Sequence, residues 1–136
     1  MYRNSKKVKG RTLREFHSSA DVWRILEFWA EESKYEMVAQ DANSRTYRKR
    51  LGVTHMVLIP MAQIGWTGSG YWLSAWSVMS GVGRTAMWTW PEETAIDQKS
   101  FINWAGDSYP LDARNIARDD VNALIEMLDA GIEPIP

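Results

Sequence analysis

The chain has 136 residues, a formal net charge of −1, eight tryptophans and no cysteine. The absence of cysteine excludes disulfides, thiolate nucleophiles, iron–sulfur clusters and zinc sites built on cysteine. No apolar run approaches the roughly 20 residues that span a bilayer, and the basic N-terminus lacks the apolar stretch of a secretory signal. We therefore expect a cytoplasmic protein with a single domain over residues 1–136 and a flexible tail at residues 1–6.

The N-terminal part of the chain predicts a strand followed by an amphipathic helix. Residues 7–17 partly alternate between apolar and polar side chains, which favours a strand. Ser18 and Ser19 then offer an N-cap for a helix over residues 20–33. Four apolar residues recur there at helical spacing: Val22, Ile25, Leu26 and Trp29. Charged residues hold the other side, so we expect this helix to pack on a sheet.

The middle of the chain predicts consecutive strands joined by short turns. The expected strands are residues 35–40, 45–52, 56–64 and 71–80, with one more around 86–90. Residues 41–44 and 67–70 are rich in the residue types that favour tight turns. The strand at 56–64 is apolar throughout, which is typical of burial on both faces, and Pro60 predicts an edge position or a bulge. Links this short imply antiparallel pairing.

The C-terminal part predicts an irregular stretch at residues 97–110 and then a second helix. Between Asp112 and Ala130, apolar residues recur at helical spacing: Ala117, Val121, Leu124, Ile125 and Leu128. Gly131 is the expected left-handed stop. This order of elements predicts an α+β two-layer fold, in which both helices cover one face of an antiparallel sheet of about five strands.

Motifs for cofactor or metal chemistry are weak. Residues 81–86 fit the spacing of a dinucleotide-binding loop, but the sequence MWTWP that follows favours a strand, not the helix that must hold a pyrophosphate. His17 and His55 each lack a second histidine or a carboxylate nearby in sequence, which argues against metal binding or general-base catalysis. No serine lies in a nucleophile elbow. We therefore expect no metal and no cofactor.

Two pairs of charged residues are candidates for catalytic or anion-binding groups. Glu92 and Glu93 follow a tryptophan-rich stretch that would raise the pKa of a buried carboxyl group. The sequence Pro-Glu-Glu more simply begins a helical turn, where acidic residues are favoured. Arg114 and Arg118 have the spacing of an anion clamp, yet ion pairs or solvation explain them more simply. An enzyme is therefore disfavoured and ranks below binding functions.

The N-terminal half is basic. Residues 1–50 carry 12 Lys/Arg against 7 Asp/Glu, whereas residues 51–136 carry 4 against 10. One predicted strand surrounds Tyr47 with cations: Arg45, Arg48, Lys49 and Arg50. Such a strand can bind single-stranded nucleic acid by stacking and phosphate contacts, but it also suits an exposed sheet edge that must not pair with other chains. Because the domain is not basic overall, nucleic-acid binding is only the second alternative function.

Tryptophan is the unusual feature of the composition, since five of the eight lie between residues 66 and 90. Trp23 and Trp29 belong to the first predicted helix. The other six are the candidate binding residues: Trp66, Trp72, Trp76, Trp88, Trp90 and Trp104. Trp72 and Trp76 share one face of their strand and can pack under the first helix, whereas the other four are harder to bury together. We expect a non-enzymatic binding domain whose aromatic sheet face, left uncovered by the helices, buries a second copy or a protein partner. The first alternative is a pocket for a hydrophobic or aromatic small molecule between the sheet and the C-terminal helix, lined by Trp72, Trp76, Trp88 and Trp90.

Overall fold

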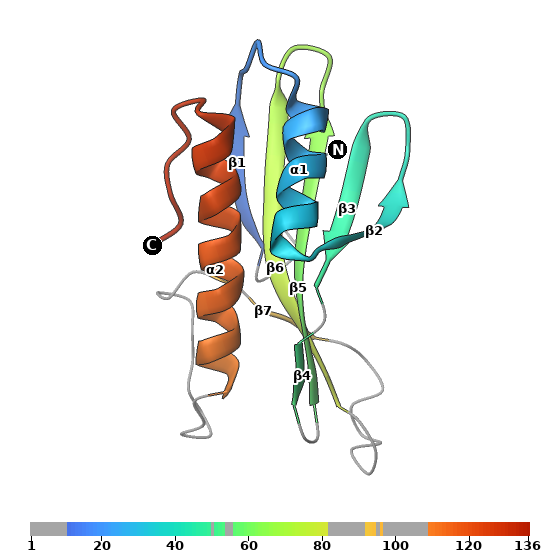
Figure 1. Cartoon of the computed structure of the whole chain (residues 1–136), viewed down its shortest axis with the longest axis vertical. Helices are drawn as coiled ribbons and strands as arrows, with labels where there is room; N and C mark the ends of the chain where they lie inside the picture. The colour runs from blue at the N-terminus through green and yellow to red at the C-terminus, as the bar shows by residue number, and fades with distance from the viewer. Residues whose placement is uncertain (1–10, 50, 54–55, 82–91, 95, 97–108) are drawn as a thin grey trace.

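In the computed structural model of the chain, two helices lie side by side on one face of an antiparallel sheet (Figure 1). This confirms the predicted α+β two-layer fold. The structure describes residues 11–49, 51–53, 56–81, 92–94, 96 and 109–136. The strand expected around residues 86–90 and most of the irregular stretch expected at 97–110 lie outside these residues.

The sheet contains seven strands in the described part of the chain. Their bounds are β1 Thr12–Phe16, β2 Glu36–Gln40, β3 Ser44–Arg48, β4 Leu51–Val53, β5 Met56–Trp66, β6 Tyr71–Gly81 and β7 Glu92–Thr94. The order across the sheet is β1-β6-β5-β3-β2, with β4 paired to β5 and β7 paired to β6. The long strands β5 and β6 therefore form the centre, and each has two successive partners on its outer side.

The turn predicted at residues 67–70 joins β5 to β6. Trp66 and Tyr71 are the last facing pair of the hairpin. Gly68 has a φ of 97°, a conformation that glycine adopts without steric cost. The Thr67 hydroxyl oxygen accepts a hydrogen bond from the backbone N–H of Gly70 at 3.2 Å. The turn thus has the glycine and hydroxyl chemistry that the sequence predicted.

Pro60 lies in the middle of β5, an interior strand, so the predicted edge position is wrong. Its carbonyl accepts a hydrogen bond from the Lys49 N–H at 3.0 Å, on the side of β5 that faces β3 and β4. The missing N–H of proline points to the same side, because both groups of one residue do so in an antiparallel ladder. There β3 has ended at Arg48 and β4 begins only at Leu51. The register is the same on both sides of this gap, and the absent N–H of proline leaves the ladder one hydrogen bond short here.

Helix α1 spans Val22–Ser33, and Asp21 is its N-cap. The Asp21 carboxylate accepts a hydrogen bond from the Arg24 N–H at 3.3 Å. The predicted cap at Ser18 or Ser19 is therefore wrong, because Asp21 directly precedes the first helical residue while the two serines lie in the bend before it.

Helix α2 spans Tyr109–Leu128 and runs antiparallel to α1, beginning slightly upstream of the predicted start (Figure 1). Asp129 and Gly131 follow it with positive φ angles of 47° and 71°. Beyond this stop the chain is held to α2, because the Asn122 side chain exchanges two hydrogen bonds, of 2.8 and 2.9 Å, with the backbone of Ile135.

The core lies between the helices and the sheet. The predicted apolar stripe of α2 is buried throughout, as are Val22, Leu26 and Trp29 of α1, whereas Ile25 is only half-buried. The sheet contributes buried residues from four strands: Phe16 from β1, Tyr47 from β3, Ala62 and Ile64 from β5, and Leu73 and Ala75 from β6. Both helices therefore pack on the same side of the central strands.

β2 is one edge of the sheet, and all five of its residues are exposed. Its pairing with β3 shifts register between Met37 and Ala39. The basic strand β3 lies inside this edge, between β2 and β5. The expectation that its cations protect an exposed edge is therefore wrong, because a further strand, β2, adds outside it.

Candidate functional site

The face of the sheet away from the helices carries the candidate site. Leu73 and Ala75 belong to the core under the helices, so the alternation of β6 directs Trp72 and Trp76 to the opposite face. Facing residues of β5 and β6 share this side in the register. We call the following eight residues the open sheet face: Ile59, Met61, Gln63, Gly65, Trp72, Ser74, Trp76 and Val78.

The open sheet face is more apolar than a solvated sheet face. Antiparallel sheets that face water on one side alternate apolar and polar residues, with the polar ones outward. Here most of the outward residues are apolar: Ile59, Met61, Trp72, Trp76 and Val78. None of the eight is charged. The two central strands therefore carry apolar side chains on both faces. The described helices cover one face; on the other, Gly65, Ser74 and Trp76 are buried and the remaining five residues are half-buried.

Trp72 lies across Gly65 on the neighbouring strand. A Cβ atom at Gly65 would overlap the indole atoms Cε2, Cζ2 and Nε1 of Trp72. Gly65 therefore provides the space in which the indole ring rests against the backbone of β5. Trp72 is half-buried in this position, with part of its ring accessible.

Trp76 is covered on the same face by Arg11, just before β1. The Arg11 guanidinium carbon lies 3.7 Å from the ring centroid, and the Trp76 side chain is only 4% exposed. Such a cation–π contact contributes about 0.5–2 kcal/mol, more where the cation is desolvated. The accessible apolar surface of the open sheet face therefore comes from the neighbours of Trp76 more than from Trp76 itself.

The structure brings together two of the six candidate tryptophans. Trp72 and Trp76 share the open sheet face, which turns them away from both helices and from any pocket beneath α2. The expectation that they pack under the first helix is therefore wrong, because Leu73 and Ala75 occupy the helix side of β6. Trp66 is separate, because it lies two residues after the core residue Ile64 and so shares the helix side of β5 at the hairpin end. Its ring is 38% exposed and lies 4.7 Å from that of Tyr71. The remaining three lie outside the described residues: Trp88, Trp90 and Trp104.

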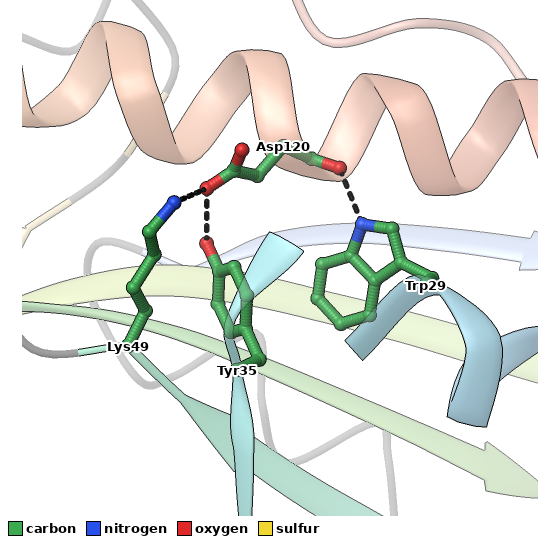
Figure 2. A network of polar contacts seen from close by, with 4 residues as sticks. All are labelled: Trp29, Tyr35, Lys49 and Asp120. Carbon is green, nitrogen blue, oxygen red and sulfur yellow. Dashed lines mark hydrogen bonds and ion pairs between the residues drawn. The ribbon is translucent and has the colours of Figure 1, made fainter. Parts of the chain in front are cut away.

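A polar network joins α1, α2 and the sheet (Figure 2). One carboxylate oxygen of Asp120 accepts hydrogen bonds from the Tyr35 hydroxyl and the Lys49 ammonium group, both at 3.0 Å. The backbone carbonyl of the same residue accepts a hydrogen bond of 2.8 Å from the Trp29 indole N–H. Burial and the adjacent Asp120 charge raise the pKa of Tyr35 above its usual range, so this phenol stays protonated. The network links the two helices and the sheet, and its carboxylate and phenol are hydrogen-bonded to each other, so neither is positioned as a general base.

The residues weighed for catalysis are far apart or outside the described residues. His17 lies at the hairpin, where its Nδ1 is 3.1 Å from the Ser69 carbonyl oxygen, and His55 is outside the described residues. Glu92 and Glu93 belong to strand β7 and face Met79 and Val78 of β6, so the predicted helical turn is wrong. Hydrogen bonding of this segment to β6 outweighs the preference of its two acidic residues for the first turn of a helix. Within the described part, no group of three potential metal ligands gathers.

The charges proposed to bind anions are largely paired within the protein. The Nη2 atom of Arg118 lies 3.6 Å from the carboxylate of its neighbour Asp119, whereas its buried Nη1 atom has no hydrogen-bond partner in the described part of the chain. The side chain of Arg114 is outside the described residues. The cations of the basic strand and its end contact acidic residues in three ion pairs: Arg45–Glu27 at 3.3 Å, Arg48–Glu36 at 2.9 Å and Lys49–Asp120 at 3.0 Å. These contacts use the groups that a nucleic-acid phosphate would need.

Two further findings concern the chain as a whole. In the described part of the chain, neither helix combines the length and apolar character needed to cross a bilayer. Comparison with protein-family models, with curated proteins and with solved structures finds no match to this chain.

Proposed function

We propose that this domain acts by binding, without catalysis, and that its open sheet face buries the same face of a second copy. The observation that carries the proposal is the apolar character of β5 and β6 on both sides. Ala62 and Leu73 face the core, while Met61 and Trp72 face away from it. An antiparallel sheet with such an outward face gains stability when that face is removed from water.

The chemistry of the open sheet face favours a copy of itself as partner. None of its eight residues is charged, and the charged side chains beside them on the same side, Arg11 over Trp76 and Glu15 opposite Trp72, have opposite signs. A two-fold axis would place the same residues on both sides, as in most homodimers. The half-buried Trp72, held over Gly65, supplies a rigid aromatic anchor of the kind that dominates interface energies.

The polar network supports binding over catalysis. Its carboxylate, Asp120, already accepts hydrogen bonds from Tyr35 and Lys49. The raised pKa of Tyr35 prevents it from acting as a base near neutral pH. These groups hold α2 against α1 and the sheet, and thereby stabilise the sheet whose opposite face carries the candidate site.

Native mass spectrometry across a dilution series tests the proposal, with analytical ultracentrifugation as a second measurement. The diagnostic variant is Gln63→Lys, because Gln63 is a half-buried polar residue in the middle of the open sheet face. Each copy would then bury a lysine in an interface whose eight residues are uncharged, and we expect the dimer dissociation constant to rise by about tenfold or more. Ala42→Lys is the matched control, since it adds the same charge at an exposed position between β2 and β3.

Each outcome decides between functions. A dimer that dissociates on dilution and is weakened by Gln63→Lys alone supports the proposal. A monomer at every concentration overturns it. A monomer with additional bound mass favours instead the small-molecule alternative and identifies that ligand by its weight.

A further inference from the structure

An apolar groove lies along the two helices, on the side of the molecule opposite the open sheet face. It has a volume of about 410 Å³ and is lined by Asp21, Arg24, Ile25, Phe28 and Met127. Phe28 is 55% exposed and Met127 is 37% exposed, so two large apolar side chains from different helices remain in water at the same place. Surface apolar residues gathered in a groove, unlike scattered ones, are typical of a contact site.

The surroundings of the groove are acidic. Glu31 and Glu32 follow Phe28 by three and four residues, which places them on the same side of α1. On α2, the exposed Glu126 directly precedes Met127. Asp21 and Arg24, one acidic and one basic residue, line the groove itself. Among the described side chains of the helices, their caps and the C-terminal segment, Arg24 and Lys34 are exposed and basic, whereas the exposed acidic ones outside the ion pairs named above are Asp21, Glu31, Glu32, Glu126, Asp129 and Glu133.

We infer that this groove binds a basic amphipathic helix of a partner protein. The apolar side of such a helix would cover Phe28 and Met127, and its lysines or arginines would reach the surrounding carboxylates. Methionine and phenylalanine in an acidic groove suit this occupant, because the flexible thioether adapts to different apolar side chains. The surplus of acidic groups disfavours both the same face of a second copy and an anionic membrane surface.

This inference is independent of the proposed self-association. The groove belongs to the outer side of the helices, whereas the open sheet face lies beyond the core on the other side of the sheet. Dimer formation therefore leaves the groove accessible, and the two surfaces can be tested by separate variants.

Fluorescence anisotropy with a synthetic peptide tests the inference on the full chain. The probe is a labelled peptide of about four helical turns, with leucine on one face and lysine on the other. We expect saturable binding that weakens as ionic strength rises. Phe28→Gln is expected to weaken binding by about tenfold. Met37→Gln is the matched control, since Met37 is 47% exposed on β2, away from the groove.

Further comparisons separate groove binding from simple charge attraction. A scrambled peptide of the same composition, without an apolar face, is expected to bind at least about tenfold more weakly. A peptide with glutamate in place of lysine is expected not to bind. The inference is overturned if the scrambled peptide binds as tightly as the leucine–lysine peptide, or if the leucine–lysine peptide does not bind. It is also overturned if Phe28→Gln binds the leucine–lysine peptide as tightly as the unchanged protein does. Because Phe28 is exposed, its replacement leaves the core intact, which thermal unfolding of the variant verifies.

Discussion

Replacement of Gly65 by alanine tests the contact that holds Trp72 on the open sheet face. The added Cβ would overlap the indole ring, and the two residues face each other across β5 and β6. Eleven facing pairs join these strands, so the backbone cannot easily move apart to relieve the overlap. The ring must therefore rotate away from β5 and lose its contacts there.

Two opposing effects set the magnitude. Alanine in place of glycine normally stabilises by roughly 0.4–1 kcal/mol, because the unfolded chain loses conformational freedom. Forcing extra atoms into a filled space costs about 1–3 kcal/mol. We therefore expect Gly65→Ala to lower the free energy of unfolding by about 1–2 kcal/mol. The sign is opposite to that of an unobstructed strand position.

Urea denaturation followed by circular dichroism measures this difference through the midpoint and slope. Trp72→Val provides the second arm, because valine keeps a strand-favouring side chain but removes the ring over Gly65. In the Trp72→Val background, Gly65→Ala is expected to be neutral or stabilising. The two substitutions should thus show a coupling energy of about 1–3 kcal/mol.

The reasoning is refuted if Gly65→Ala raises the urea midpoint of the parent protein, because the ring then cannot occupy the space above Gly65. Equal destabilisation in both backgrounds would also refute it. In that case the backbone of β5, and not Trp72, requires glycine.

Three further predictions concern the helices and the polar network. Asp120→Asn removes the anionic partner of Lys49 and is expected to lower the free energy of unfolding by about 1.5–3 kcal/mol in urea denaturation. The control Asp119→Asn, at an exposed position, should change this free energy by no more than about 0.5 kcal/mol. Equal losses for the two variants would contradict the stabilising role of the network. Asp21→Ala removes the N-cap of α1 and should cost about 1 kcal/mol by thermal unfolding, whereas Asp21→Ser should restore most of it. Burial raises the pKa of Tyr35 above its ordinary 10.0, so the folded chain holds this proton more tightly. The contribution of the protonated Tyr35 to the free energy of unfolding is fully present below pH 10.0 and is lost as the pH rises above that value. Urea midpoints measured against pH should therefore decline above pH 10.0, and Tyr35→Phe should make this decline smaller.

The secondary structure with clear periodicity could be predicted from the sequence. The five apolar residues of α2 recur at helical spacing, and every one of them is buried. The turn at residues 67–70 follows from its two glycines and its hydroxyl side chains. Because consecutive strands with short turns must be antiparallel, these local patterns were sufficient for the two-layer fold.

Features that depend on distant strands could not be predicted in this way. Glu92 and Glu93 suit the first turn of a helix by themselves, but an unpaired side of β6 draws them into a strand. Pro60 lies opposite the gap between β3 and β4, which only the register of the sheet reveals. In both cases a local preference is outweighed by hydrogen bonding to another part of the chain.

The candidate site was predictable in part. Alternation along β6 places Trp72 and Trp76 on one face, but does not show which face the helices cover, because both are apolar. The space over Gly65 requires the pairing of β5 with β6 and has no local signal. The Asp120 network has none either, since its contacts to Tyr35 and Lys49 span 85 and 71 residues.

The shifted register of β2 bears on how far an assembly of this protein can grow. A chain that adds to a sheet edge needs a regular ladder of N–H and C=O groups. The irregularity between Met37 and Ala39 interrupts that ladder at the exposed edge. Pairing through the sheet face, by contrast, would bury that face on both copies and leave none of it for a third copy. Further copies of this chain are therefore not expected to add as strands at the β2 edge.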